Sequence, residues 1–194
     1  MSNNLPGHCA PAVGFEVLLE MLAACHGRVQ AQCTMLQRLV PHLVAHGAHR
    51  PAQEAAAAVL RYFDTAARHH HEDEEQDLFP ALLESMAASD AVCIRELTGA
   101  LCADHRALEA CWAALRPLLA QMAAGASTPL ALADVQAFAQ MYAQHIAREE
   151  GELLPMAARL LSDAELDRVG FAMRLRRGLV SADGVAGLPG AMRF

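Results

Sequence analysis

The chain has 194 residues, enough for a single domain with its own hydrophobic core. Hydrophobic residues make up 54% of it and aromatic residues only 5%, and good helix formers dominate the composition. The sequence therefore predicts an all-α protein. The formal net charge is −7 and Lys and Arg are spread thinly, which disfavours nucleic acid as a partner because phosphate binding requires a basic face.

The first residues have neither the charged start nor the continuous apolar stretch of a signal peptide. No apolar run approaches the ~20 residues that a membrane span requires, so we expect no membrane association and a cytoplasmic location. The cysteines lie far apart within helical patterns, which favours small buried residues over disulfides or zinc ligands. They are Cys9, Cys25, Cys33, Cys93, Cys102 and Cys111.

Residues 1–14 are predicted to form a flexible lead-in. A first helix over about 15–46 should end at Gly47, because glycine readily adopts the conformation that closes a helix. Pro41 falls inside this helix and predicts a kink or a local break. A second helix is predicted over about 51–87.

The third helix covers about 90–124. Thr128 and Pro129 are typical of a helix cap and a first-turn proline, so they are predicted to open a fourth helix that reaches about residue 161. Four long helices with short connections predict an up-down-up-down four-helix bundle over residues 15–161.

A shorter fifth helix is predicted over residues 162–178. Ser162 and Glu165 have the spacing of a capping box at its start, and arginines in its last turn suit the helix dipole. Residues 179–194, rich in Gly, Ala and Pro, are predicted to be a flexible tail.

Two stretches repeat the pattern H-x-x-x-E-E-x-x-L-[FL]-P at a constant offset of 75 residues, from His70 on the second helix and from His145 on the fourth. A histidine and a glutamate four residues apart lie on one face of a helix. Each stretch can therefore aim an imidazole and a carboxylate, Glu74 or Glu149, at the same point.

Histidines on the other two helices fall at the same height as these pairs. His26 lies about 20 residues before the turn at Gly47, and His70 lies a similar number after it, so in antiparallel helices that rise ~1.5 Å per residue they come level. The same count across the next two turns brings His105 and His145 to this level. Four histidines and two glutamates from four helices are therefore predicted to form one layer.

The donor types in this layer indicate a metal site. Imidazoles and carboxylates suit iron or manganese, and two carboxylates can bridge two ions. The side chains leave room for a bridging oxygen and an open position for a small diatomic. Taken singly, His26 or His105 could be a hydrogen-bonded core histidine, and the charged run Arg68–Asp77 a solvated face. The shared level and the repeated motif favour metal, because these groups would otherwise be buried without partners.

Comparison with the fourth helix decides which histidine and which glutamate of the first motif face the layer. His71 and Glu75 have the same spacing as His70 and Glu74, but His145 has no histidine after it, so the inner pair is His70 and Glu74. His71, Glu75 and Glu150 are then candidates for a supporting or surface role. Glu109 is a candidate extra carboxylate and Tyr142 a core residue. The other histidines are interpreted as surface or turn residues: His8, His42, His46, His49 and His69.

The chain resembles the hemerythrin-like HHE cation-binding family, bacterial relatives of the oxygen-carrying hemerythrins, over about residues 15–160. The resemblance rests on the histidine of the first helix, the two motifs and the pair Asp104-His105. It implies four terminal histidine ligands, two glutamates that bridge two iron ions, and an additional oxo or hydroxo bridge, with manganese or zinc as substitutes. These residues are His26, His70, His105 and His145, and Glu74 and Glu149.

Two departures from the oxygen carriers bear on function. The oxygen carriers have a fifth histidine where this chain has Glu109, and an aspartate where it has Glu149. The pattern is closer to bacterial members implicated in nitric-oxide and oxidative-stress responses. The resemblance thus implies a non-haem di-iron protein that binds or reacts with oxygen, nitric oxide or peroxide, in stress response or iron handling. The alternatives are a di-iron redox enzyme that consumes peroxide or nitric oxide, and a structural or regulatory metal-binding bundle. No protein partner is indicated.

Overall fold

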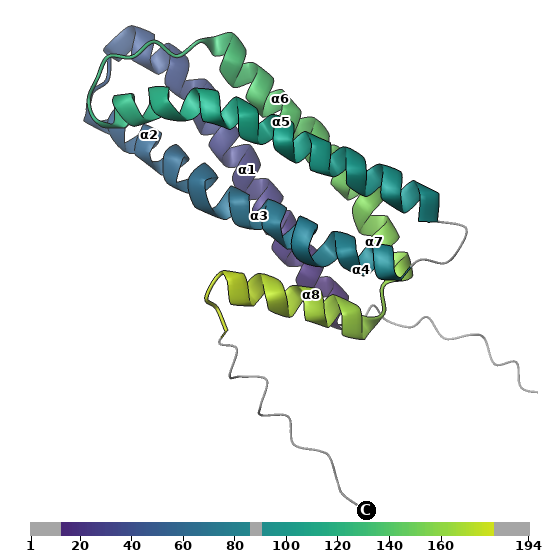
Figure 1. The fold of residues 1–194 in the computed structure, drawn as a ribbon. Helices are drawn as coiled ribbons and strands as arrows, with labels where there is room; N and C mark the ends of the chain where they lie inside the picture. Colours follow the sequence, from purple (N-terminus) through teal and green to yellow (C-terminus); the bar gives the residue numbers. More distant parts are fainter. Residues whose placement is uncertain (1–12, 86–90, 181–194) are drawn as a thin grey trace, which may run out of the picture.

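The computed structural model describes residues 13–85 and 91–180 (Figure 1). Within these ranges the secondary structure is entirely helical, as the composition predicts. The first helix, α1 (Val13–His46), runs through Pro41 without the predicted break. Pro41 is exposed, so water can satisfy the carbonyl of Gln37 that loses its hydrogen bond. Gly47 ends the helix at a φ of 69°, as predicted.

The second long helix is one rod of five consecutive segments. They are α2 (Arg50–Arg61), η1 (Tyr62–Ala66), α3 (Ala67–Asp73), η2 (Glu74–Leu78) and α4 (Phe79–Glu84). The η segments are π-helical turns, in which the backbone hydrogen bond reaches back five residues instead of four. The predicted end of this helix falls partly outside the described residues.

The third long helix, α5 (Ala91–Ala123), contains Pro117 and is followed by Gly125 at a φ of 90°. The fourth rod consists of α6 (Leu132–Arg148), η3 (Glu149–Leu153) and α7 (Leu154–Leu160). It begins later than Thr128 and Pro129 predict.

A side-chain hydrogen bond between Thr128 and Gln121 accounts for the late start of α6. The Thr128 hydroxyl does not cap the helix but donates a hydrogen bond to Oε1 of Gln121, 3.0 Å away at the end of α5. Residues 126–131 are therefore irregular, and the helix begins after Ala131, whose backbone is extended (ψ 126°). Thr128 and Pro129 close the connection between the two helices instead of opening the second.

A fifth helix, α8 (Asp163–Arg176), follows the bundle and lies beside α1 and α3 (Figure 1). The predicted capping box is present: the Ser162 backbone N–H donates to Glu165 Oε2 at 2.7 Å. Gly178, at a φ of 67°, follows the last turn. Residues 1–12 and 181–194, which include most of the predicted lead-in and tail, lie outside the described residues.

Each π-turn in the two repeated motifs is linked to a proline. Pro80 has no N–H to donate to the carbonyl four residues back, and its ring would collide with that carbonyl. The helix widens just before it, and the Phe79 N–H donates to the carbonyl of Glu74, five residues back. The same happens in the second motif, where Leu154 donates to Glu149 and Pro155 follows. The proline of each motif thus places a π-turn at its glutamate.

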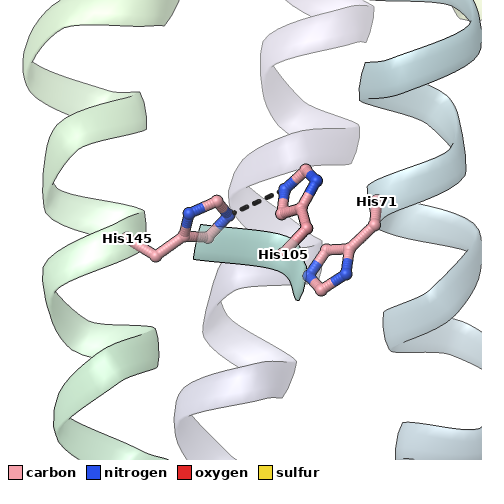
Figure 2. A group of neighbouring side chains, drawn as sticks. All are labelled: His71, His105 and His145. Carbon is pink, nitrogen blue, oxygen red and sulfur yellow. Dashed lines mark hydrogen bonds between the residues drawn. The ribbon is translucent and has the colours of Figure 1, made fainter. Parts of the chain in front are cut away.

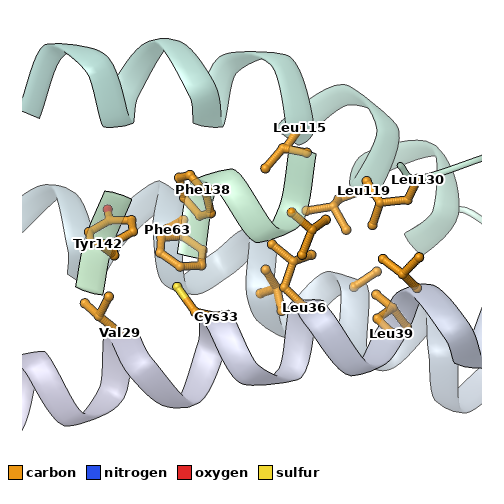
Figure 3. Packing of buried hydrophobic residues seen from close by; sticks show 14 of the residues in the cluster. Val29, Cys33, Leu36, Leu39, Phe63, Leu115, Leu119, Leu130, Phe138 and Tyr142 are labelled. Atoms are coloured by element: carbon orange, nitrogen blue, oxygen red, sulfur yellow. The ribbon is translucent and has the colours of Figure 1, made fainter. Parts of the chain in front are cut away.

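The four rods form a closed bundle in which α1 contacts α2 and α6, and α5 also contacts α2 and α6. Two apolar clusters fill its interior. One lies toward the turn between α1 and α2 and includes Leu36, Phe63 and Phe138 (Figure 3). The other includes Leu82 and Leu153 together with the buried side chains of α8. Between the two clusters lies a layer of buried polar side chains.

The cysteines of the described residues are free thiols, namely Cys25, Cys33, Cys93, Cys102 and Cys111. Cys25 and Cys33 are buried, as predicted, whereas Cys93 is exposed. Cys9 lies outside the described residues. Among the described helices, none has the length and apolar character that a bilayer crossing would need.

Candidate metal centre

The six predicted ligands are all brought together in the polar layer. Each is at most 2% exposed, so the site lies inside the bundle and not on its surface. They come from four rods, one each from α1 and α5 and two each from the repeated motifs. The six are His26, His70, Glu74, His105, His145 and Glu149.

One half of the site is formed by His26, His70 and Glu149. Each offers a ligand atom, and these atoms all lie within 4.8 Å of one another. Nε2 of His26 is 3.1 Å from Oε2 of Glu149, and Nε2 of His70 is 3.9 Å from the same oxygen. These atoms surround a point where one cation could sit.

The other half is formed by His105, His145 and both glutamates, again with ligand atoms within 4.8 Å of one another. The Nε2 atoms of the two histidines are 3.2 Å apart. Nε2 of His105 lies 3.2 Å from Oε2 of Glu74, and Nε2 of His145 lies 2.7 Å from Oε1 of Glu149. This group could hold a second cation.

Both carboxylates are shared between the two halves. Glu74 turns Oε1 toward His70, at 3.9 Å, and Oε2 toward His105. Glu149 turns Oε2 toward His26 and Oε1 toward His145. A carboxylate that presents one oxygen to each of two neighbouring positions is the arrangement of a bridging ligand. Each of the two carboxylates therefore faces both histidine groups.

The donors lack other partners. Both ring nitrogens of His70 and both oxygens of Glu149 are buried and make no hydrogen bond. Leaving such groups unpaired in a protein interior is costly, so an arrangement of this kind is stable only if something else binds them. Cations suit this donor set, because neutral imidazoles and carboxylates are the ligands of iron, manganese and zinc.

Two further carboxylates hold two of the histidines, His26 and His105, from outside the layer. Nδ1 of His26 lies 2.8 Å from Oε1 of Glu150, and Nδ1 of His105 lies 2.7 Å from Oε1 of Glu75. Engaging Nδ1 in this way leaves Nε2 free to face the centre. Glu75 and Glu150 are equivalent in the two motifs. In each E-E pair the first glutamate points inward, and the second supports a histidine of a neighbouring helix.

Burial and neighbouring charges shift the pKa values of the groups in this layer. Burial lowers the pKa of His70 to about 3, so this ring is neutral at physiological pH. Burial and the charge of Glu149 raise the pKa of Glu74 well above its usual value. Burial opposes ionisation of Glu149 too, but the adjacent imidazoles of His145 and His26 outweigh it and hold its pKa well below the usual value. Cations between the carboxylates would allow both to ionise.

The helix of the first motif is also held from outside by α8. Asp73, next to Glu74, is 1% exposed and forms ion pairs with Arg176 and Arg177. Arg176 also donates to Oδ2 of Asp77 at 2.7 Å. The charged run Arg68–Asp77 is therefore not a fully solvated helix face, because Asp73 within it is buried under α8.

The structure also gives the positions of Glu109 and His71, whose roles the sequence leaves open. Glu109 does not reach the layer: its side chain is 48% exposed and pairs with Arg106 at 2.7 Å. His71, assigned a supporting or surface role, is 6% exposed and lies against the His105 side of the site. Residue spacing gives the height of a side chain along its helix, but packing between the rods decides which neighbours that side chain meets.

The remaining predictions about single residues agree with the structure where it describes them. Tyr142 is a core residue, with its ring centroid 5.1 Å from that of Phe138. The other described histidines lie outside the buried layer and are partly or fully exposed, namely His42, His46, His49 and His69. His8 lies outside the described residues.

A family model, the hemerythrin HHE cation-binding domain, matches residues 17–157, a range that covers most of the four rods and includes all six predicted ligands. The chain belongs to this family. Cation binding is a property of this family, and the buried His/Glu groups of this chain are where a cation could bind. The chain is also 34% identical to an uncharacterised protein of Haemophilus influenzae over 159 residues, which cover 82% of this chain and 89% of that protein.

Replacing Glu74 by alanine is predicted to abolish binding of at least one metal ion, because it removes an oxygen from each half of the site. Metal per chain, measured by elemental analysis after reconstitution, tests this. Glu72→Ala, on the same helix but paired with Arg68 outside the layer, should retain full content. Two ions per chain in Glu74→Ala would show that the ligand assignment is wrong.

Replacing Glu75 by glutamine is predicted to lower metal affinity about 10- to 100-fold without changing the stoichiometry at saturation. The neutral amide is a poorer acceptor for the Nδ1 proton of His105, so the ring is less basic and less well oriented. Competition with a chelator measures the affinity. Glu152→Gln, an exposed glutamate of the second motif, is the matched control. Equal affinities in the two variants would contradict a supporting role for Glu75.

Proposed function

We propose that the protein is a non-haem di-iron protein whose centre binds or reacts with a small ligand such as oxygen, nitric oxide or peroxide. The observation that carries the proposal is that Glu74 and Glu149 each turn one oxygen toward each of the two histidine groups. A site of two adjacent ions with an imidazole-rich shell suits iron, with manganese or zinc as substitutes. Iron would supply redox chemistry and an open position for a small ligand.

The four histidines and the two glutamates would have different roles in this centre. His26 and His70 would hold one ion, His105 and His145 the other, and the glutamates would join them. The apolar clusters on either side limit the access of water, which strengthens electrostatic interactions within the layer. A buried centre of this kind suits a diatomic or peroxide, and neither nucleic acid nor a membrane is needed as a partner.

A cavity offers a route toward the centre. It has a volume of about 420 Å³ and lies between α5 and the rod that contains η1 and α3. Phe63, Trp112 and Tyr142 contribute to an apolar lining, and His71 belongs to its wall. The ring of His71 stacks on that of His105 with centroids 4.0 Å apart. A small ligand in this cavity would contact His71, whose ring lies against His105 of the metal layer.

A role in nitrosative or oxidative stress or in iron handling follows from this chemistry. The rival functions, a redox enzyme and a structural bundle, use the same ligands and differ in what the loaded centre does. A binding protein shows a ligand-dependent spectrum without turnover, and an enzyme consumes peroxide or nitric oxide catalytically. A structural bundle does neither.

The first experiment is metal analysis together with visible absorption of protein produced in iron-replete cells, kept anaerobic or exposed to air. We expect two irons per chain and a charge-transfer band that changes when oxygen or nitric oxide is added. A colourless protein that holds zinc and takes up no iron on reconstitution would overturn the proposal in favour of the structural bundle. Loss of added peroxide over many turnovers would support the enzyme.

A further inference from the structure

His71 is a third histidine at one half of the metal layer. His71, His105 and His145 each offer a ring nitrogen, and the three nitrogens all lie within 4.8 Å of one another (Figure 2). The His71 side chain is 6% exposed, and its Nε2 is buried without a hydrogen-bond partner. A buried imidazole nitrogen without a partner is unfavourable, so its position beside two other donors needs a cause.

The surroundings of His71 offer a cation site but no other polar partner for this nitrogen. Its ring stacks on His105, with an interplanar angle of 11°, and lies edge-on to His145 with centroids 5.8 Å apart. On its other side are the aromatic residues of the 420 Å³ cavity, including Tyr142.

We infer that His71 is the third histidine ligand of the ion held by His105 and His145. The inference rests on the proposed dinuclear site and adds a ligand to it. Glu109 is exposed and paired with Arg106, while a histidine from the adjacent rod occupies the space beside His105.

This ligand makes the two halves of the site unequal. The half with His105 and His145 has three histidines and the shared carboxylates. The half with His26 and His70 has two histidines and the same carboxylates. It would therefore offer an ion one protein donor fewer than the half with His71.

His71→Phe tests the inference, because phenylalanine retains an aromatic ring to stack on His105 but removes the nitrogen. Metal-free full-length protein is titrated with Co²⁺, whose visible absorption reports its ligand environment. In the wild type we expect two ions per chain. In His71→Phe we expect one ion to bind as before and the other at least ~10-fold more weakly, with an altered spectrum. His69→Phe, the neighbouring half-buried histidine, should behave like the wild type.

The outcomes separate this inference from the proposed function. If the wild type binds a single Co²⁺, the dinuclear proposal fails. If the wild type and His71→Phe both bind two ions with the same affinities and spectra, only the role of His71 is overturned. Circular dichroism of the metal-free variants checks that they fold, and His71→Gln provides a smaller replacement should phenylalanine disturb the core.

A separate group of histidines lies at the end of the bundle, about 16 residues or ~24 Å along α1 from His26. His42 and His46 are one helical turn apart at the end of α1, and His49 precedes α2. The Nε2 atoms of His42 and His49 are 3.3 Å apart. The ring of His46 lies 4.8 Å from that of His42 and 6.2 Å from that of His49, measured between centroids.

The spacing of the His42 and His49 nitrogens matches that of two zinc ligands. With Zn–N bonds of about 2.0–2.1 Å and tetrahedral angles, two ligating nitrogens are about 3.3–3.4 Å apart. Two histidines four residues apart on a helix can bind one ion together, and a third on the adjoining turn leaves a fourth position for water. The three rings are at least partly exposed, so they can adjust to an ion.

We also propose that His42, His46 and His49 form a surface site for a late first-row divalent cation, with zinc as the probe. Titration of the iron-loaded full-length protein with Zn²⁺ should reveal one zinc per chain beyond the content of the buried centre. His42→Ala should lose this zinc but keep its iron, and His69→Ala should keep both. The proposal is overturned if the wild type takes up no extra zinc, or if His42→Ala still takes it up.

Discussion

Imidazoles and carboxylates buried at the centre of an apolar bundle impose the main constraint on this structure. Apolar clusters lie on both sides of the layer, so its polar atoms have no access to bulk water. Several of them, including both oxygens of Glu149, have no hydrogen-bond partner. An interior of this kind is favourable only when cations or their equivalent complete it. Binding of metal and stability of the bundle should therefore be linked.

The two repeated motifs place their polar side chains in this layer with the same local structure, a π-turn followed by a proline. In each, a proline removes one backbone hydrogen bond and the helix widens into a π-turn that starts at the inner glutamate. The inner glutamate faces both histidine groups, and the next glutamate crosses to a histidine of a neighbouring helix. A single short pattern therefore supplies a terminal ligand, a shared carboxylate and an outer support. Its use on two rods gives the site much of its internal symmetry.

Departures from that symmetry determine what the centre can do. The first motif has an additional histidine, His71, whereas the second has Ile146 at the equivalent position. His71 lies beside His105, next to a cavity with aromatic walls, so one half of the layer differs from the other in donors and in access. The first motif is also covered by α8 through the ion pairs of Asp73, which restrains this rod from outside.

The sequence by itself determined the all-α class, the repeated motif and the level of the six ligands, because these depend on helix periodicity and on residue counts between turns. The capping box at Ser162 and the closing glycines were predictable for the same reason, since their signals are local. The start of α6 was not, because Thr128 bonds to Gln121 across the connection. The burial of His71 and the exposure of Glu109 were decided by tertiary structure. Both depend on how the rods pack against one another, which spacing along a single helix does not give.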